Sequence, residues 1–451
     1  MEIAWCEDMT SIVADLAGAI TGVATLVQCS RRLDRDQWLP AGVLAERRRT
    51  RFRQLLRRAA SAPYYRAILH DAGLHDFNNI ELHDLARLPF LDREVIATRG
   101  LDDFLTVGRS KLFSVTTSGS TGTPGRFLRS RPEEADFSAR WWRVYAAFGC
   151  SVFDAQVNVA GPVKPDRQGP ITLLRKTGLL PRIGRLCSNE PPERVLSKVL
   201  ELNPPILTGY AGAMEALAEH VLATGARIQP PRAVFCTAME VTARCLMVAE
   251  QAFQAPAVDV YVTNEFGVIA WSCPKRRDLL HVNDDTFAVE IVSPDGAPLP
   301  PGSTGELVVT SFGLNSMPLI RYRMGDLAAR VAEPCECGRG LGLVSRIQGR
   351  TAHSIRRSDG GLITTPIITN LFGRARAYEW VRQFQVREER GGILRVLVNI
   401  RNTPTDTQRN TLTSLLHSGI GPDFQISLET VDQIPLAPSG KLQFLVPFAR
   451  T

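Results

Sequence analysis

Short apolar runs alternate with amphipathic stretches through the middle of the chain. Residues 204–225 and 232–253 each begin with an apolar run of strand length and continue into a segment with helical spacing. Residues 113–122 (FSVTTSGSTG) lead in the same way toward a predicted helix that is rich in aromatic side chains. Strand–turn–helix units favour a largely parallel sheet with helices on its faces, so the predicted fold class is α/β.

The pattern changes toward the C-terminus. Residues 286–311 contain two alternating strands around a turn rich in Gly and Pro, which predicts an antiparallel pair. After Gly349–Arg350, we expect a second strand pair joined through Gly391–Gly392, then a helix over Thr407–Ser418 and one more strand. These features predict a small α+β domain. The predicted organisation is a helical N-terminal extension (1–40), a large domain rich in parallel strands (41–350) and a small, mobile C-terminal domain (351–451).

The N-terminal part of the large domain carries a basic helix. Phe52, Leu55, Leu56 and Ala59 recur at helical spacing, and the arginines fall on the other face. We interpret that face as solvated rather than as an anionic docking site.

Composition and charge then narrow the function classes. The chain has 451 residues, of which 44% are hydrophobic, and this excludes a disordered or fibrous protein. The net charge is +7, and the segment Arg47–Arg58 alone contains seven arginines. Outside this one segment the chain is near neutral, so no basic groove and no nucleic-acid partner are predicted.

No targeting or membrane segment is predicted. Residues 11–28 are apolar but are interrupted by Asp15 and preceded by acidic residues, unlike a secretory signal or a stable membrane span. The nine cysteines are odd in number and scattered, which argues against a disulfide framework. We therefore expect a cytoplasmic protein.

A loop rich in Gly, Ser and Thr follows the first predicted strand of the large domain. Thr116–Arg126 reads TTSGSTGTPGR, in which glycines let backbone N–H groups approach an anion and hydroxyls add donors. It lacks the Gly-Lys-Ser/Thr of a Walker loop and the spacing of a dinucleotide fingerprint. The order SGSTGTPG resembles the phosphate loop of adenylate-forming enzymes, the superfamily of acyl-CoA synthetases and adenylation domains.

Four further motifs follow in the order of that superfamily. Tyr261-Val-Thr-Asn-Glu265 resembles its Tyr-Gly-x-Thr-Glu, and Gly305-Glu-Leu with Arg321-Tyr-Arg-Met-Gly-Asp326 resembles its Gly-Glu-Leu and Tyr-Arg-x-Gly-Asp pair. The domain hinge is marked by Gly349-Arg350, and the small domain carries Ser439-Gly440-Lys441. SAPYYRAIL, MPLIRYRMGDL and the Cys-Glu-Cys-Gly-Arg insert resemble phenylacetate–CoA ligases and their capsular-polysaccharide relatives. The likeness covers about residues 41–448.

The resemblance implies that a carboxylic acid attacks the α-phosphate of ATP, which gives an acyl adenylate and pyrophosphate. Glu265 would bind Mg²⁺, a hard cation suited to carboxylate oxygen, and Asp326 would accept hydrogen bonds from the ribose hydroxyls. Arg350 would lie near the α-phosphate, and Lys441 would bridge the carboxylate and that phosphate. The remaining nucleotide-binding residues implied by the resemblance are Ser118, Gly119, Ser120, Thr121, Gly122, Thr123, Ala238, Met239, Glu240, Tyr261 (stacked on adenine) and Asn264.

The acceptor of the acyl group stays open. The family hinge usually reads Gly-Arg-x-Asp-Asp, whereas Ala352 and His353 stand at the two Asp positions here. The resemblance implies a small domain that rotates to admit the thiol of coenzyme A or of a carrier protein. The altered hinge leaves two alternatives: an amide-forming ligase that uses an amine, and a non-catalytic relative.

Four further residues have the chemistry of a metal site. Cys273 and His281 flank the turn CPKRRDLLH, and Cys335 and Cys337 lie in PCECGRG. Together they offer a Cys₃His set, although Cys-x-Cys is tighter than the usual zinc spacing and reduced loop cysteines are the alternative. Similar ligands occur in some phenylacetate–CoA ligase relatives, so the resemblance implies a structural Zn²⁺.

The acyl pocket is expected between the helix after the phosphate loop and the strands before Glu240 and Glu265. Its candidate lining is aromatic, which favours an aryl or arylacetic acid, although the same residues could be ordinary core. The candidates are Trp142, Tyr145, Phe148, Tyr210 and Phe235.

Overall fold

The computed structural model describes most of the chain. Several predicted functional residues lie outside the described part, namely the phosphate-loop residues Ser118–Thr123, the hinge residues Ala352 and His353, and Lys441. The described residues are 24–116, 125–151, 153–161, 182–351, 354–359, 361–435 and 442–448.

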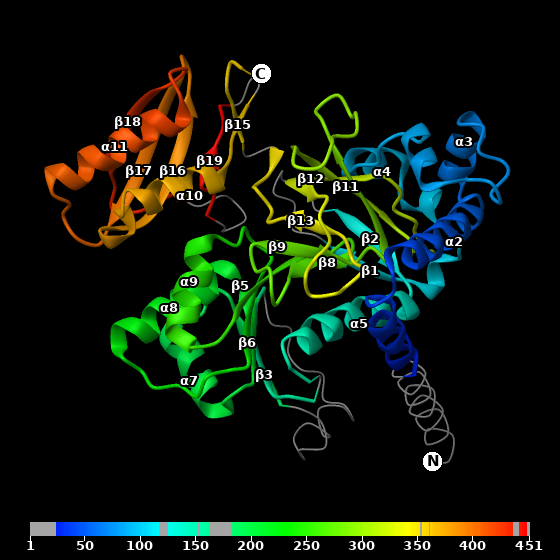
Figure 1. Cartoon of the computed structure of the whole chain (residues 1–451), viewed down its shortest axis with the longest axis horizontal. Helices are drawn as coiled ribbons and strands as arrows, with labels where there is room; N and C mark the ends of the chain where they lie inside the picture. The colour runs from blue at the N-terminus through cyan, green and yellow to red at the C-terminus, as the bar shows by residue number, and fades with distance from the viewer. Residues whose placement is uncertain are drawn as a thin grey trace, which may run out of the picture.

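A large mixed sheet organises the N-terminal part of the molecule (Figure 1). Among the described residues it has 11 strands in the order β10-β11-β12-β13-β9-β8-β7-β6-β5-β3-β4. Strands β3 to β7 pair in parallel, and the other pairings are antiparallel. The strands are β3 (Gln156–Ala160), β4 (Ile183–Cys187), β5 (Ile206–Tyr210), β6 (Ala233–Thr237), β7 (Ala257–Thr263), β8 (Gly267–Ser272), β9 (Leu279–Val282), β10 (Phe287–Val292), β11 (Thr304–Ser311), β12 (Tyr322–Val331) and β13 (Leu343–Ser345).

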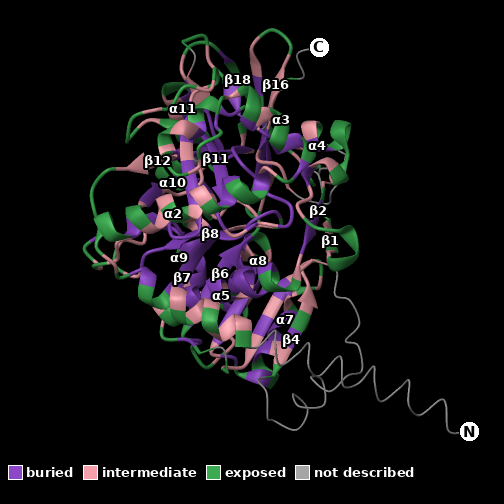
Figure 2. Cartoon of the chain, turned by 90° about the vertical axis from the view of Figure 1, so that its right-hand side faces the viewer, coloured by how far each residue is buried: buried purple, intermediate pink, exposed green. Residues whose placement is uncertain are grey.

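Helices cover both faces of the parallel strands, as the sequence pattern predicted. Helices α7 (Pro192–Leu202), α8 (Ala211–Thr224) and α9 (Ala243–Phe253) pack on one face through an aliphatic core, while α5 (Arg131–Ala147) packs on the other. Strands β6 and β8 are buried along their whole length (Figure 2) because neither face meets water. The helices on both faces of the sheet explain the apolar runs that precede each predicted helix.

One predicted strand–helix unit is wrong. The segment after the phosphate loop continues as a second strand, β2 (Arg126–Arg129), which pairs antiparallel with β1 (Phe113–Thr116). Helix α5 begins only at Arg131, where Ser130 and Glu133 form a reciprocal capping box. The described residues on either side of the loop therefore belong to one hairpin, and Gly and Ser are also typical of hairpin turns.

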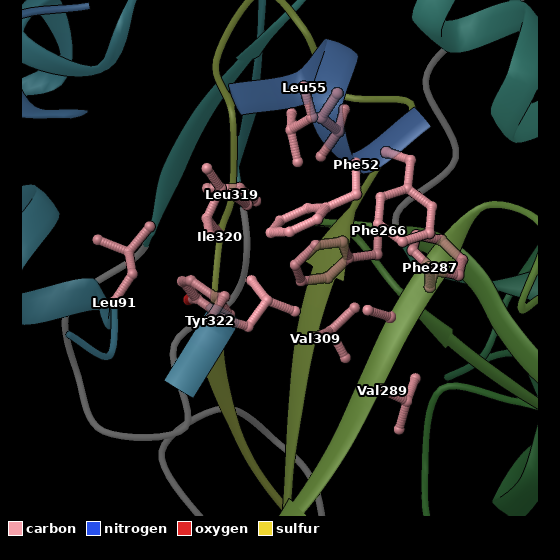
Figure 3. Close-up of a cluster of buried hydrophobic side chains, with 14 of the residues drawn as sticks. Phe52, Leu55, Leu91, Phe266, Phe287, Val289, Val309, Leu319, Ile320 and Tyr322 are labelled. Carbon is pink, nitrogen blue, oxygen red and sulfur yellow. The ribbon is translucent and has the colours of Figure 1, made fainter. Parts of the chain in front are cut away.

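The basic helix α2 (Ala41–Ala59) buries the predicted apolar stripe. Phe52 and Leu55 lie beside Phe266 and Phe287 in the core of the antiparallel half (Figure 3), where the Phe266 ring is 5.9 Å from that of Phe287. The continuous helix, the following α3 (Pro63–Asp71) and the break at Pro63 agree with the predicted pattern.

The arginine face of α2 is not simply solvated, which corrects our interpretation. Arg47 pairs with the buried Asp36, Arg48 lies 3.6 Å from Asp284, and Arg53 lies 2.8 Å from Glu81. Residues 24–36 form a helix, and the carboxylate of its last residue, Asp36, contacts α2. Most of the local positive charge is thus neutralised by contacts from segments distant in sequence.

The C-terminal part forms a separate α+β unit. Its four-stranded sheet has the order β18-β17-β16-β19, and the hairpin β16 (Val381–Glu389) to β17 (Ile393–Ile400) turns at Gly391 and Gly392, which have positive φ. Helices α10 (Thr365–Arg374) and α11 (Asp406–Ile420) pack on it through one core. The other strands of this part are β14 (Ile355–Arg356), β15 (Leu362–Ile363), β18 (Gln425–Thr430) and β19 (Leu445–Val446).

The small unit lies against α8 and α9 of the large one (Figure 1). Arg401 donates to Glu219 at 2.5 Å, and the Arg244 guanidinium lies 4.9 Å from the Tyr378 ring centroid. In the part of the chain that the structure describes, no helix has the length and apolar character needed to cross a membrane.

Candidate active site

Two adjoining cavities open at the carboxyl ends of β5, β6 and β7, where open α/β sheets commonly bind ligands. The first has a volume of about 230 Å³ and lies between the two units, with residues 442–445 of the small unit on one wall. The second has a volume of about 760 Å³ and runs toward α5. Both are lined by Arg93, Ala238, Val262, Thr263 and Arg350. A ligand with two parts can therefore extend from one cavity into the other.

Three predicted nucleotide-site residues meet in one hydrogen-bonded network. The Tyr261 hydroxyl donates to Asp326 Oδ2 at 2.6 Å, and Arg350 Nε donates to Asp326 Oδ1 at 2.9 Å. Asp326 and Arg350 also form an isolated antiparallel bridge, which places Arg350 beside β12. Burial raises the pKa of Tyr261, and the Asp326 carboxylate raises the pKa of Arg350. The network thus holds a neutral phenol, a carboxylate and a permanent cation on one wall.

The turn after β6 lines the first cavity with Ala238, Met239 and Glu240. Ala238 has a φ of 62°, a left-handed conformation that is costly for a residue with a Cβ. Met239 N closes the turn on Thr237 O at 2.8 Å. The Glu240 carboxyl interacts with Thr365 of the small unit, and burial raises its pKa to about 8. A neutral carboxyl at this position is a hydrogen-bond donor as well as an acceptor.

Glu265, the predicted magnesium ligand, is buried just after β7. Its Oε1 accepts from Arg93 Nη2 at 2.8 Å, and Arg93 also interacts with the Tyr322 hydroxyl. Arg93 begins α4 (Arg93–Arg99), whose N-cap Asp92 accepts from Val95 N. Arg93 lines both cavities, although it was not predicted as a site residue. An arginine at the start of a short helix is no signal in itself. Its partner Glu265 is 172 residues away in sequence.

Asn264 connects this site to the strand that precedes the phosphate loop. Its side chain donates to Thr116 O at 3.4 Å, and its own carbonyl accepts from Arg129 Nη2 at 2.7 Å. Thr116 and Arg129 belong to β1 and β2, the two strands of the hairpin. Thr116, the last described residue before the phosphate loop, therefore lies beside Asn264, and Arg129 contacts Asn264 from the other end of the hairpin.

Three predicted pocket residues lie in the core, which corrects their assignment. Phe235 is fully buried, with Tyr145 4.9 Å and Phe148 5.9 Å from it between ring centroids. Tyr210 does line the second cavity, together with Trp141 instead of the predicted Trp142. One residue turns an α-helix by about 100°, so only one of two adjacent tryptophans can face the sheet with Tyr145 and Phe148.

The predicted Cys₃His set comes together at the end of the antiparallel strands. Cys273 follows β8, His281 lies on β9, and Cys335 and Cys337 lie between β12 and β13. The Cys273 and Cys335 sulfurs are 3.4 Å apart, His281 Nε2 is 3.2 Å from Cys337 Sγ, and all four ligand atoms lie within 4.8 Å of one another. Tetrahedral zinc with bonds of about 2.3 Å places ligand atoms roughly 3.8 Å apart, so the donor set and its spacing fit zinc.

The large sheet, its carboxyl-end cavities and the separate C-terminal unit define the fold of the adenylate-forming ligases. The structure of 2-hydroxyisobutyryl-CoA ligase in its postadenylation state matches with a TM-score of 0.75 at 19% identity, over 92% of each chain. The same ligase in its thioesterification state gives a TM-score of 0.60. Amide bond synthetase McbA from Marinactinospora thermotolerans gives 0.53 at 17% identity, over 74% of this chain and 67% of that chain.

Sequence comparison shows similarity to particular members of that class. Residues 355–447 match the family model described as the CapK C-terminal domain. The phenylacetate-coenzyme A ligase of Thermus thermophilus is 25% identical over 307 residues, which span 64% of this chain and 66% of that enzyme. Protein CapK of Staphylococcus aureus is 21% identical over 398 residues, 86% of this chain and 85% of CapK. The chain is a homologue of these proteins, which confirms the resemblance expected from its motifs.

Proposed function

We propose that the protein adenylates a carboxylic acid with ATP, releases pyrophosphate and transfers the acyl group from acyl-AMP to a thiol of coenzyme A or a carrier protein. The observation that carries the proposal is the network of Tyr261, Asp326 and Arg350, which lines a cavity bounded by the small unit. Arg350 also lines the adjoining cavity, where Glu265 lies. The phenylacetate-coenzyme A ligase relatives and the ligase fold support the same reaction.

Each part of the site supplies one requirement of phosphate chemistry. Adenylation brings two anions together, so the site must position them and neutralise the charge that develops on the phosphates. We assign the ribose to Asp326, the α-phosphate to Arg350 and the other phosphates to Ser118–Thr123. The adenine lies beside Tyr261 and the turn at Ala238–Glu240. Lys441 provides the second cation at the reacting carboxylate, and its neighbour Leu442 lines the cavity.

Two metal ions belong to this proposal. Glu265 would hold Mg²⁺, because its buried carboxylate is a suitable hard ligand. Cys273, His281, Cys335 and Cys337 would hold a structural Zn²⁺. Thiolate ligands and a nucleotide substrate both suit a reducing compartment, so we place the enzyme in the cytoplasm.

The acceptor has a second candidate. Ala352 and His353 replace the hinge Asp residues of the family, and McbA, an amide bond synthetase, shares the fold. We therefore keep transfer to an amine as the alternative to thioester formation. The aryl or arylacetic acid expected from the sequence loses much of its basis, because three of its five aromatic residues lie in the core.

ATP–pyrophosphate exchange that depends on an added carboxylic acid tests the proposal directly. Purified protein with Mg²⁺ should exchange label with at least one acid from a panel of aryl, aliphatic and hydroxy acids. Coenzyme A, carrier protein and amines added after adenylation then identify the acceptor. Folded protein that gives no exchange with any acid is a non-catalytic relative, and the ligase proposal is then wrong.

Lys441→Ala tests the assignment of the second cation. We expect exchange to fall by at least about 100-fold, since removing one preorganised charge at a transition state costs roughly 10²–10³ in rate. ATP affinity should change little, because the lysine acts on the reacting groups. Normal exchange by this variant would contradict the role. Lys198→Ala is the control, because Lys198 lies on α7, pairs with Glu201 and lines neither cavity.

A further inference from the structure

The floor of the second cavity belongs to one face of the parallel strands. Val157, Val159 and Leu207 contact the core under α7, α8 and α9. Because successive side chains on a strand alternate between faces, Asn158 and Thr208 point toward the α5 side. The same alternation places Tyr210 on β5 and Thr237 on β6 on that side.

This face changes character along the strands. Near the amino ends, Ile206 and Phe235 pack under the aromatic side chains of α5. Toward the carboxyl ends the cavity lining is polar. Asn158 and Thr208 are directly paired neighbours on β3 and β5, and Tyr210 and Thr237 are paired neighbours on β5 and β6. Four side chains with hydrogen-bonding groups therefore form the floor, and Trp141 lines the same cavity.

Two of these polar side chains can form further hydrogen bonds. Thr237 Oγ1 donates to Gly209 O at 3.3 Å, whereas within the described part of the chain neither the Asn158 amide nor the Thr208 hydroxyl has a hydrogen-bond partner. Thr208 is 3% exposed, Asn158 is partly exposed, and both line the cavity. A ligand that covers these two groups is favoured if it forms hydrogen bonds with them, because a polar group that is buried without a partner is costly.

The charged residues around the cavity are already engaged. Arg93 pairs with Glu265, Arg323 with Glu306 and Arg350 with Asp326. Of the other acidic residues on the wall, Asp92 caps α4 and Glu94 is exposed to solvent. The floor itself carries neither acid nor base, so it suits an uncharged hydrogen-bonding group and not an ammonium or a second carboxylate.

We propose that Asn158 and Thr208 select a carboxylic acid that carries an uncharged hydrogen-bonding group, namely a hydroxyl, over an otherwise matched hydrocarbon acid. This inference rests on the proposed adenylation and names its substrate class. A site built to bond a hydroxyl rejects analogues that lack it far more strongly than an apolar pocket rejects a missing methylene, which changes the rate only about 10–200-fold. Trp141 then contacts the hydrocarbon part of the acid.

Binding of stable acyl-adenylate mimics tests this selection without requiring turnover. The probes are acyl-sulfamoyl adenosines in matched pairs: 2-hydroxyacyl, 3-hydroxyacyl and 4-hydroxyphenylacetyl compounds, each against its methyl or hydrogen counterpart. Calorimetry should show at least tenfold tighter binding for the hydroxyl member of at least one pair. In Thr208→Val and Asn158→Leu the affinities of the two members of that pair should differ by less than about twofold. Thr208→Ser should keep the wild-type ratio of the two affinities. Thr224→Val, on the exposed end of α8, is the control.

The outcomes separate this inference from the proposed function. Equal binding of both members in every pair, or a ratio that survives both cavity substitutions, overturns the hydroxyl selection and leaves adenylation standing. No binding of any mimic, together with no pyrophosphate exchange, removes the proposed function and the selection with it. A hydroxyl preference that depends on both side chains supports the inference.

Discussion

At the scale of single residues, Arg93 is one of two arginines in the described part of the chain, with Arg350, that line both cavities. Its guanidinium touches the buried Glu265 carboxylate and lines the space on both sides. If Glu265 and the phosphates share a metal ion, the same guanidinium is placed to balance the phosphate charge. Arginine is suited to this because it stays charged and donates in a planar fork.

Arg93→Gln should lower kcat/KM for ATP by about 10- to 100-fold, since one charged donor to the phosphates is lost. Steady-state exchange kinetics at saturating acid measure this effect, and calorimetry of ATP binding gives a readout without turnover. Arg93→Lys should recover part of the loss. Arg99→Gln, which removes an exposed arginine at the other end of α4, is the matched control. A change of less than twofold in the Arg93→Gln variant would show that Arg93 only anchors α4.

Glu240 makes stability depend on pH in a defined direction. Burial raises its pKa from the ordinary 4.5 to about 8, so between these values the unfolded chain loses the proton and the folded protein keeps it. Stability contributed at this site is therefore full below about pH 4.5 and declines as the pH rises to about 8.

Glu240→Gln removes this titration while it keeps a side chain of similar size. Relative to the wild type, the variant should gain in Tm as the pH is raised from 5 to 8.5, as measured by thermal unfolding at a series of pH values. Glu201→Gln, exposed on α7, is the control. A Tm difference that stays constant across the series would mean that Glu240 is ionised in the folded protein.

At the scale of elements, α5 shows how rotation decides which residues reach the site. Trp141, Tyr145 and Phe148 share the face that meets the sheet, and Trp141 alone of these lines the cavity. The aromatic side chains packed near the amino ends of the strands stabilise the sheet. The polar side chains at the carboxyl ends line the second cavity. The lining of the second cavity is therefore separated from the aromatic core by one level of side chains along the same strands.

The loop between β12 and β13 is the element most dependent on the predicted zinc. Cys335→Ser should lower bound zinc from about one equivalent to under about a tenth, and should lower Tm by about 3 °C or more because metal binding contributes to folding. Elemental analysis and thermal unfolding of purified protein measure the two effects. Cys187→Ser, half-buried outside the cluster, should change neither. If the purified wild-type protein contains less than about a tenth of an equivalent of zinc, the assignment is wrong.

At the scale of the whole molecule, the contact between the two units sets the geometry of the first cavity. Glu219 on α8 is shared by Arg244 of the large unit and Arg401 of the small unit. The arrangement of the units superposes better on 2-hydroxyisobutyryl-CoA ligase in its postadenylation state than in its thioesterification state, with TM-scores of 0.75 and 0.60. We infer that this ion pair favours the orientation of the two units seen in this structure.

Glu219→Gln and Arg401→Gln should each shift the small unit away from this orientation by a factor of up to about five, because a partly exposed ion pair contributes about 1 kcal/mol or less. Fluorescence energy transfer between labels on the two units measures the shift. The double variant should be no worse than either single variant, since both remove the same contact. Arg409→Gln, on α11 of the small unit, is the control. Additive effects in the double variant would mean that the residues act independently.

Local patterns determined much of this protein. The helices, the hairpins of the antiparallel half and the order of the motifs were predictable, because apolar periodicity and turn chemistry depend on residues two to four positions apart. The residue types for the nucleotide site were predictable for a different reason: a resemblance preserves Tyr261, Glu265, Asp326 and Arg350 at recognisable spacing. The Cys₃His set was predictable as chemistry, although its Cys-x-Cys spacing alone was a weak signal.

Only the tertiary structure decided which side chains share a space. Arg93 meets Glu265 across 172 residues, and the acidic partners of α2 come from separate segments. The choice of Trp141 over Trp142 follows from the rotation of α5 on the sheet, and the pairing of Asn158 with Thr208 follows from parallel register. The sequence by itself determined the elements and the kind of chemistry, because both are encoded locally. The lining of the second cavity was decided by long-range packing, which no local pattern specifies.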